Sequence, residues 1–81
     1  MDWSDCDLVE SVPGKVSGAP VIKGTRIFAN SIPENYESSL DEGMTSEEAI
    51  AEIADNFPGA GVQRIRGLLA YYFEHQPQPQ S

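Results

Sequence analysis

The residue types that most often carry out chemistry in proteins are isolated in this sequence. His75 is the one histidine and Cys6 the one cysteine among the 81 residues. A catalytic histidine needs a nucleophile or a second titratable group within reach, and a metal site needs several ligands at a fixed spacing. Neither residue is accompanied by such a motif, and the sequence has no glycine-rich phosphate loop. We therefore predict that the protein is not an enzyme and that it uses no cofactor and no metal.

Carboxylates are abundant instead, and they are concentrated in the middle of the chain. Thirteen acidic residues stand against five basic ones, which gives a formal net charge of −8. Residues 31–57 hold eight of the acidic residues and no basic residue. Such a stretch repels phosphate and attracts a basic protein surface. We predict that Glu47, Glu48, Glu52 and Asp55 bind a protein partner. The alternative is that these acids only solvate and cap two short helices.

Candidate nucleic-acid contacts are few. They are Lys23, Arg26, Gln63, Arg64 and Arg66. Two of them, Arg64 and Arg66, are separated by about 200° around a helix, so they cannot both point into one DNA groove. A helix-turn-helix protein also lays its first helix across the phosphate backbone, and here that helix is acidic. DNA is therefore a possible partner that the local acidity disfavours.

An extended N-terminal section must position the first of these basic residues. Within residues 8–28, short β-branched segments are separated by Pro13-Gly14 and by Ser17-Gly18, which are turn signals. A third short strand over residues 26–28 is expected to complete a β-hairpin or meander. Gly24 is expected to adopt a positive φ angle.

Three helices follow over residues 31–75, so the fold class is α+β and mainly α. Ser31-x-x-Glu34 and Thr45-x-x-Glu48 both have the form of a capping box, which predicts the starts of the first two helices. The third helix is predicted to begin near residues 60–62 and to end near His75. The last two helices and the short turn between them resemble a helix-turn-helix pair.

The two ends of the chain are predicted to lie outside this ordered part. Residues 1–7 are expected to be flexible, and the Gln-Pro-rich residues 76–81 cannot bury apolar surface and are expected to be disordered. The domain is thus predicted to span residues 1–75. No basic-then-apolar leader and no run long enough for a membrane span are present, so we expect a cytoplasmic protein that does not bind membranes.

Aromatic residues exceed what a small core needs. Tyr71, Tyr72 and Phe73 together cover nearly the full circumference of the last helix, and Trp3 adds a fourth ring. One face of that helix has to pack on the core, so the remaining rings predict a subunit interface. We therefore expect a homodimer.

The block Gly18-Ala19-Pro20-Val21-Ile22-Lys23-Gly24-Thr25-Arg26-Ile27, followed by Gly43-Met44-Thr45 and Phe57-Pro58, resembles a prokaryotic family. This is the domain-of-unknown-function family numbered four-three-three. The resemblance implies a homeodomain-like helix-turn-helix fold behind a small β-element, and similarity to antitoxins encoded beside PIN-like ribonuclease toxins. It also implies a structural role for the motif residues, which are Gly18, Pro20, Val21, Ile22, Gly24, Thr25 and Arg26.

Two departures from the family pattern affect the last helix and the motif. Ala19 stands where relatives carry a bulky or basic residue, and Gly59-Ala60-Gly61 replaces a polar helix cap. The two glycines are expected to form the turn itself, because each would destabilise a helix interior. Arg26 is expected to pair with a carboxylate of the acidic helices or with a strand carbonyl.

These observations predict an antitoxin-like, protein-binding module that neutralises a basic PIN-like ribonuclease through an acidic surface. The first alternative is a helix-turn-helix regulator that binds DNA, and the second is a dimeric interaction protein of another kind. His75 has no suitable neighbour in the sequence, and we do not expect it to be catalytic.

Overall fold

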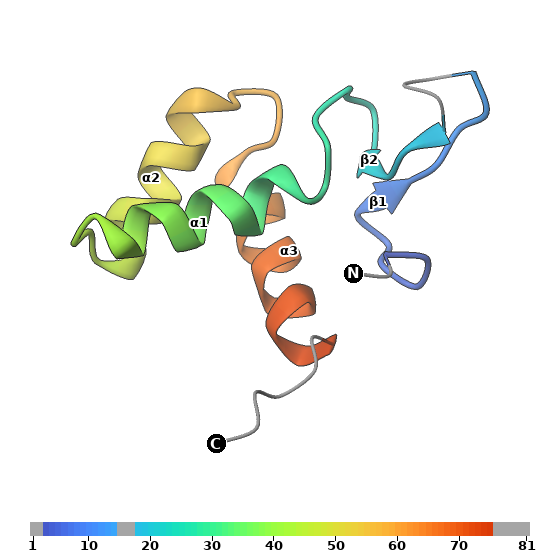
Figure 1. Cartoon of the computed structure of the whole chain (residues 1–81). Coiled ribbons are helices and arrows are strands. Elements are labelled where there is room, and N and C mark those ends of the chain that lie inside the picture. Colours follow the sequence, from blue (N-terminus) through green and yellow to red (C-terminus); the bar gives the residue numbers. More distant parts are fainter. Residues whose placement is uncertain (1–2, 15–17, 76–81) are drawn as a thin grey trace.

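The fold consists of a short β-hairpin followed by three helices. A computed structural model describes residues 3–14 and 18–75 of the chain. Its elements are β1 (Val9–Glu10), β2 (Val21–Ile22), α1 (Ser31–Asp41), α2 (Ser46–Asn56) and α3 (Val62–His75) (Figure 1). The predicted class, α+β and mainly α, is confirmed. The predicted disorder of residues 76–81 lies outside the described residues.

The hairpin is antiparallel, with Val9 opposite Ile22 and Glu10 opposite Val21. The expected third strand is not formed, because Phe28 makes only an isolated bridge to Val21. The chain leaves the sheet immediately afterwards, where the Ala29 N–H donates to the Pro20 carbonyl at 3.0 Å. A sheet of this size is not stable alone, so its stability comes from packing on the helices.

The start of α1 differs from the predicted capping box. Its N-cap is Asn30, which has a helical conformation and makes no side-chain cap, and Ser31 is already the first helical residue. The first N–H groups of α1 find backbone partners instead: Ser31 donates to Phe28, Ile32 to Ala29 and Glu34 to Asn30. No N–H remains for Ser31 to cap, and the capping-box prediction for Ser31 and Glu34 was wrong.

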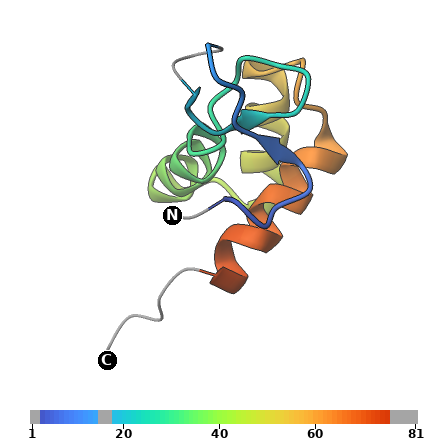
Figure 2. The same cartoon turned by 90° about the vertical axis from the view of Figure 1, so that its right-hand side faces the viewer.

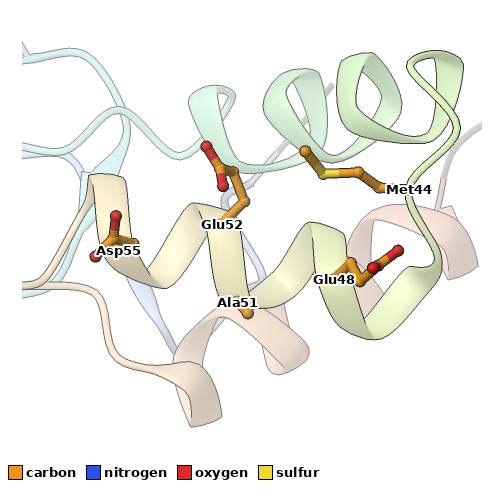
Figure 3. Close-up of a pocket in the computed structure, with 5 residues that line it drawn as sticks. All are labelled: Met44, Glu48, Ala51, Glu52 and Asp55. Carbon is orange, nitrogen blue, oxygen red and sulfur yellow. The ribbon is translucent and has the colours of Figure 1, made fainter.

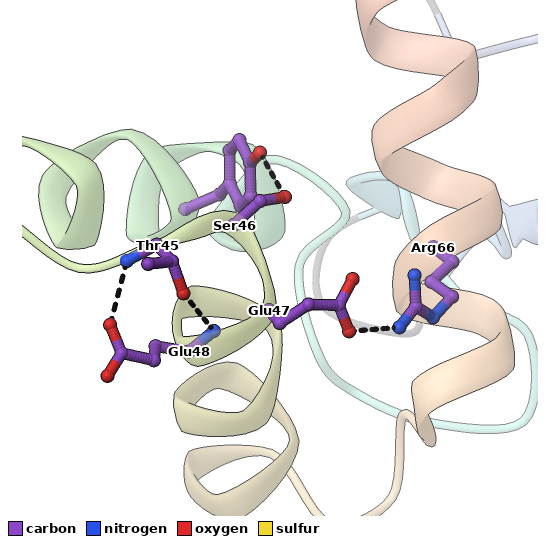
Figure 4. A network of polar contacts seen from close by, with 6 residues as sticks. Thr45, Ser46, Glu47, Glu48 and Arg66 are labelled. Carbon is purple, nitrogen blue, oxygen red and sulfur yellow. Dashed lines mark hydrogen bonds and ion pairs between the residues drawn. The ribbon is translucent and has the colours of Figure 1, made fainter.

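The start of α2 matches its prediction. The hydroxyl of Thr45 accepts a hydrogen bond from the Glu48 N–H at 3.2 Å, and the Glu48 carboxylate accepts one from the Thr45 N–H at 2.9 Å (Figure 4). Helix α1 ends at Asp41, and the turn after it contains Gly43, which has a φ angle of 97° that glycine adopts readily. The α1–α2 connection is therefore fixed by local sequence.

The turn before α3 contains both glycines, as expected. Gly61 has a φ angle of 80°, and the helix begins at the next residue. A Cβ on Gly59 would lie 3.7 Å from Ile27 Cδ1 and 3.8 Å from Thr25 Cγ2. The loop after β2 thus packs against the α2–α3 turn.

The core lies between the three helices and the hairpin. Its fully buried side chains include Ile22, Ile32, Ile53, Ile65 and Leu68, so each helix contributes at least one. The view in Figure 2 shows the hairpin and the N-terminal segment lying across α1 and α3. No helix in the described part of the chain is both long enough and apolar enough to cross a bilayer.

Residues 1–7 are expected to be flexible, and the described part of this segment, residues 3–7, differs from that expectation. Trp3 is only 3% exposed, and its indole N–H donates to Asn30 Oδ1 at 2.7 Å. Its ring stacks on Tyr71 at a centroid distance of 5.5 Å. Cys6 is buried as well. Trp3 is therefore covered within its own chain, and it cannot serve the dimer interface predicted for it.

Asn30 is available for Trp3 because of Pro33. An N-cap side chain accepts from the N–H of the second or third helical residue. The third helical residue here is Pro33, which has no N–H, and the second, Ile32, already donates to Ala29. The Asn30 amide oxygen is thus left for a partner far away in the sequence.

We predict that Trp3→Ala destabilises the fold by about 3–5 kcal/mol, because it removes a large buried aromatic ring from the core. Urea unfolding followed by far-UV circular dichroism measures this, since the variant lacks the only tryptophan. The control is Val12→Ala at an exposed site, expected to change the unfolding free energy by less than about 0.5 kcal/mol. Equal unfolding midpoints for both variants would show that residues 3–7 are not part of the cooperative fold.

We also predict that Thr45→Ala lowers the unfolding free energy by about 1 kcal/mol, because the Glu48 N–H loses its cap. Thr45→Ser retains the hydroxyl and should remain close to the wild type. Thermal unfolding of the wild type, Thr45→Ala and Thr45→Ser under the same condition measures these differences in stability. A loss in Thr45→Ser as large as that in Thr45→Ala would assign the effect to the methyl group instead of the cap.

Candidate functional site

The acidic residues of α2 separate into two groups. Glu48, Glu52 and Asp55 recur every three or four residues, so they lie along one side of the helix. Together with Ala51 and with Met44, which precedes the helix, they line an open hollow of about 380 Å³ (Figure 3). We call this surface the α2 hollow. Three of the four predicted partner-binding residues are therefore brought together.

Glu47, the fourth, belongs to a different surface. Its carboxylate forms an ion pair with the Arg66 guanidinium of α3 at 2.5 Å (Figure 4). Both side chains are exposed, so this pair is worth no more than about 1 kcal/mol. It nevertheless neutralises Glu47 and ties the start of α2 to the middle of α3.

The carboxylates of the α2 hollow differ in how they are engaged. Glu48 completes the capping box with Thr45 and is held in place by it. Glu52 and Asp55 are exposed and form no ion pair with another described residue. The hollow therefore combines two carboxylates that have no ion-pair partner among the described residues with the methyl group of Ala51 and the thioether of Met44. This combination suits the aliphatic stem and charged head of a lysine or arginine.

The predicted nucleic-acid contacts do not converge on one surface. The Arg64 guanidinium donates to the Lys23 carbonyl at 2.6 Å, which brings the loop after β2 to the start of α3. Arg66 points to Glu47 instead. The two arginines thus point to different elements of the fold. Gln63 is exposed near Arg64 in the sequence.

Arg26 does not make the expected pairing. It is exposed and forms no hydrogen bond or ion pair with another described residue. The position follows a tight turn in which the Thr25 hydroxyl donates to the Ile22 carbonyl at 2.8 Å and accepts from the Ile27 N–H at 3.0 Å. Thr25 thus makes the two hydrogen bonds that close the turn, and the Arg26 side chain remains exposed.

The neighbouring motif residues shape the backbone. Gly24 has the predicted positive φ angle, 76°, and Gly18 has one of 77°. The Gly24 N–H donates to the Glu10 carboxylate at 3.1 Å, which links this turn to β1. Val21 and Ile22 are fully buried, and the Pro20 carbonyl accepts the bond that ends the hairpin. The block thus holds the β-hairpin in position against the helices.

Three of the four aromatic residues predicted for an interface are buried or partly buried within the chain, namely Trp3, Tyr71 and Tyr72. Trp3 stacks on Tyr71 and lies 6.5 Å from Tyr72 between ring centroids. Phe73 is 40% exposed and contacts Tyr36 edge-on at 5.8 Å. Phe73 therefore remains available to a partner, and the homodimer stays a prediction.

His75 lies at the end of α3 in a local environment. Its ring stacks on Tyr71 at 4.0 Å, and its Nδ1 forms a hydrogen bond with the Tyr71 carbonyl at 2.9 Å. Over residues 3–14 and 18–75, no group of three or more His, Cys, Asp or Glu side chains is arranged to hold a metal ion. The geometry around His75 is that of a helix end.

Comparison with known families adds one match. Residues 9–72 match the model of the family described as "Protein of unknown function (DUF433)". The chain belongs to the DUF433 family. The matched span begins in β1 and ends in the last turn of α3, so the DUF433 domain contains the hairpin, all of α1 and α2, and the α2 hollow. No curated protein and no solved structure matches the chain.

Several residues of this DUF433 domain that shape the site were not predicted. Met44 and Ala51 line the α2 hollow, and only the i, i+3, i+4 and i+7 spacing of residues 48–55 could have placed Ala51 beside the acids. The partners Asn30 for Trp3 and Arg66 for Glu47 are 27 and 19 residues distant in the sequence. No local pattern indicates such pairs.

We predict that Glu47→Gln and Glu52→Gln have different effects on stability. Glu47→Gln removes the ion pair with Arg66 and should lower the unfolding free energy by up to about 1 kcal/mol, with the loss disappearing in high salt. Glu52→Gln removes an unpaired negative charge and should be neutral or slightly stabilising. Urea titrations at low and high ionic strength measure both variants. Equal effects at low salt would contradict the assignment of the ion pair.

Proposed function

We propose that this protein is an antitoxin-like binding module that docks a basic partner protein on the acidic side of α2. The partner proposed is a PIN-like ribonuclease, whose RNA-binding surface has to attract phosphate and is therefore basic. The observation that carries the proposal is the α2 hollow, where Glu52 and Asp55 have no described counter-ion and lie beside Met44 and Ala51. A basic side chain would gain both ion pairing and apolar contact there.

The wider charge pattern supports the same proposal. The stretch from residue 31 to residue 57 holds eight acids and no base, and Glu47 is the one of these acids that forms an ion pair with a described residue. The negative electrostatic field of the other acids attracts a cationic protein and increases its rate of association. Exposed charges act over a Debye length of about 8–10 Å at physiological salt, so binding should weaken as salt rises. A cytoplasmic location belongs to the same proposal.

DNA binding is the second candidate, and one observation favours it. The loop after β2 packs on the α2–α3 turn and brings the basic residues Lys23 and Arg64 together at the start of α3. However, Arg64 is engaged with the Lys23 carbonyl and Arg66 with Glu47. The acids of α2 would also lie near phosphate if α3 entered a groove in the helix-turn-helix manner. Dimerisation through Phe73 would double the acids together with the arginines.

The test is co-expression with the protein encoded by the adjoining gene, followed by measurement of complex affinity and of RNA cleavage by that protein. We expect a stable complex and inhibited cleavage. The variant Glu48→Gln, Glu52→Gln, Asp55→Asn should weaken binding at least roughly tenfold, because it removes the charges of the α2 hollow. Glutamine at position 48 can still complete the capping box, so the helix start is preserved.

The matched control neutralises three exposed acids elsewhere: Asp5→Asn, Asp7→Asn and Glu42→Gln. It changes the net charge by the same amount as the α2 variant. If the attraction depended on net charge alone, both variants would therefore weaken partner binding equally. Equal weakening would reject the α2 hollow as the docking site. Retardation of the gene's own promoter DNA at low salt, abolished by Arg26→Ala with Arg64→Ala, would favour the regulator instead.

A further inference from the structure

A second surface of the molecule exposes apolar side chains that the α2 hollow does not include. Phe73 of α3 is 40% exposed and Leu40 of α1 is 39% exposed. Tyr36 lies between them, since its ring contacts Phe73 edge-on at 5.8 Å and Leu40 follows it by one turn of α1. We call this surface, made of Tyr36, Leu40 and Phe73, the α1–α3 apolar face. The C-terminal half of α3 extends away from α1 and α2 (Figure 1).

The Tyr36 ring is fixed at the centre of this face. Its hydroxyl shares a hydrogen bond of 2.8 Å with the Ser46 hydroxyl at the start of α2 (Figure 4). The Phe73 ring also meets Tyr72 edge-on at 5.2 Å. Aromatic rings held by their neighbours lose little conformational freedom on binding, so such a face suits an apolar ligand surface.

Acidic side chains border this face. Glu37 and Asp41 lie next to each other on one side of Leu40 on α1, and Glu74 follows Phe73 on α3. Burial, the negative charge of Glu37, its hydrogen bond with Tyr72 and the negative charge of Glu34 raise the pKa of the Tyr72 hydroxyl above its ordinary value. The described cation on the same side of α3 is Arg66, two turns before Phe73, and its charge is paired with Glu47.

This charge pattern decides which occupant fits. A second copy of the chain would place its own acidic border opposite Glu37, Asp41 and Glu74, and like charges brought together across an interface cost several kcal/mol. An uncharged apolar segment would cover Leu40 and Phe73 but would leave the carboxylates partly desolvated. A helix that is apolar on one side and basic along its edges satisfies both the rings and the acids.

We propose that the α1–α3 apolar face binds a basic amphipathic helix of the partner protein. Apolar side chains of that helix cover Leu40 and Phe73, and its lysines or arginines meet Glu37, Asp41 and Glu74. This inference rests on the proposed function, because it assigns a second contact to the same basic partner. It names a surface and a partner element that are separate from the α2 hollow.

The experiment titrates the full chain with a synthetic 16-residue peptide. The peptide carries leucine at i, i+3, i+4 and i+7 in both halves and lysine at the flanking positions, and a matched peptide has glutamate in place of every lysine. Fluorescence anisotropy gives the affinity, and amide NMR shifts locate the contact. We expect binding of the lysine peptide only, with shifts concentrated in α1 and the C-terminal half of α3.

The decisive variant is Leu40→Gln with Phe73→Gln, expected to weaken peptide binding at least tenfold. Its control is Phe28→Gln, which changes a phenylalanine that is 46% exposed near the hairpin and should leave the affinity within twofold of the wild type. Since Phe73 contacts Tyr36, a second variant keeps all apolar side chains and changes Glu37→Gln with Asp41→Asn. It should weaken binding at least threefold and reduce the salt dependence.

Four results would overturn the inference. The first is equal binding of the lysine and glutamate peptides, and the second is equal weakening by Phe28→Gln and by the decisive variant. The third is a wild-type dimer by light scattering that Leu40→Gln with Phe73→Gln dissociates, since a second copy would then cover the face. Loss of peptide binding only in the triple variant of the α2 hollow would also reject this face, but the proposed function would stand. If the triple variant of the α2 hollow bound the partner protein as tightly as the wild type, the α2 hollow would be rejected as a docking site and the α1–α3 apolar face would stand.

Discussion

Burial of Trp3 between the start of α1 and the end of α3 is the contact on which the rest of this small fold depends. The hairpin has only two residues in each strand and cannot hold the N-terminal segment alone. Trp3 joins it to Asn30 through the indole N–H and to Tyr71 through ring stacking. In the same segment, Leu8 lies so close to Gly67 that a Cβ there would come within 2.5 Å of Leu8 Cδ1. The helix glycine thus makes room for the segment.

Charge is distributed around this framework in an uneven way. Each arginine of α3 is directed to a fixed partner, Arg64 to the Lys23 carbonyl and Arg66 to Glu47. Neither arginine neutralises the far side of α2, so the charges of Glu52 and Asp55 remain available to other molecules. Among the described residues, the one ion pair joins Arg66 of α3 to Glu47 of α2 and leaves the other acids of α1 and α2 without a basic partner. The negative charge of the molecule is therefore concentrated in its α1–α2 layer.

The sequence predicts best what local chemistry decides. The Thr45 capping box, the positive φ angle of Gly24 and the start of α3 after Gly61 follow from residues adjacent in the chain, and all three are found. The capping box at Ser31 fails because Pro33 and a backbone turn had changed which N–H groups needed a partner. The contacts of Trp3 and of Glu47 depend on how elements 27 and 19 residues apart meet, and no local pattern encodes that. The helical spacing predicts that the acids of the α2 hollow lie together. It does not predict Met44, which lines the hollow from the turn that precedes the helix.

The capping box of α2 also gives the α2 hollow a direction. Glu48 stands in the first turn of the helix, where the aligned peptide dipoles contribute about half a positive charge, while Asp55 stands in the last turn, where they contribute about half a negative one. No basic residue in that last turn offsets the negative end. The electrostatic potential therefore becomes more negative along the helix from Glu48 towards Asp55, although the side-chain charges are equal. A cationic group that reaches the hollow experiences a gradient as well as an attraction, and its most favourable position lies at the end of α2 that faces the glycine turn.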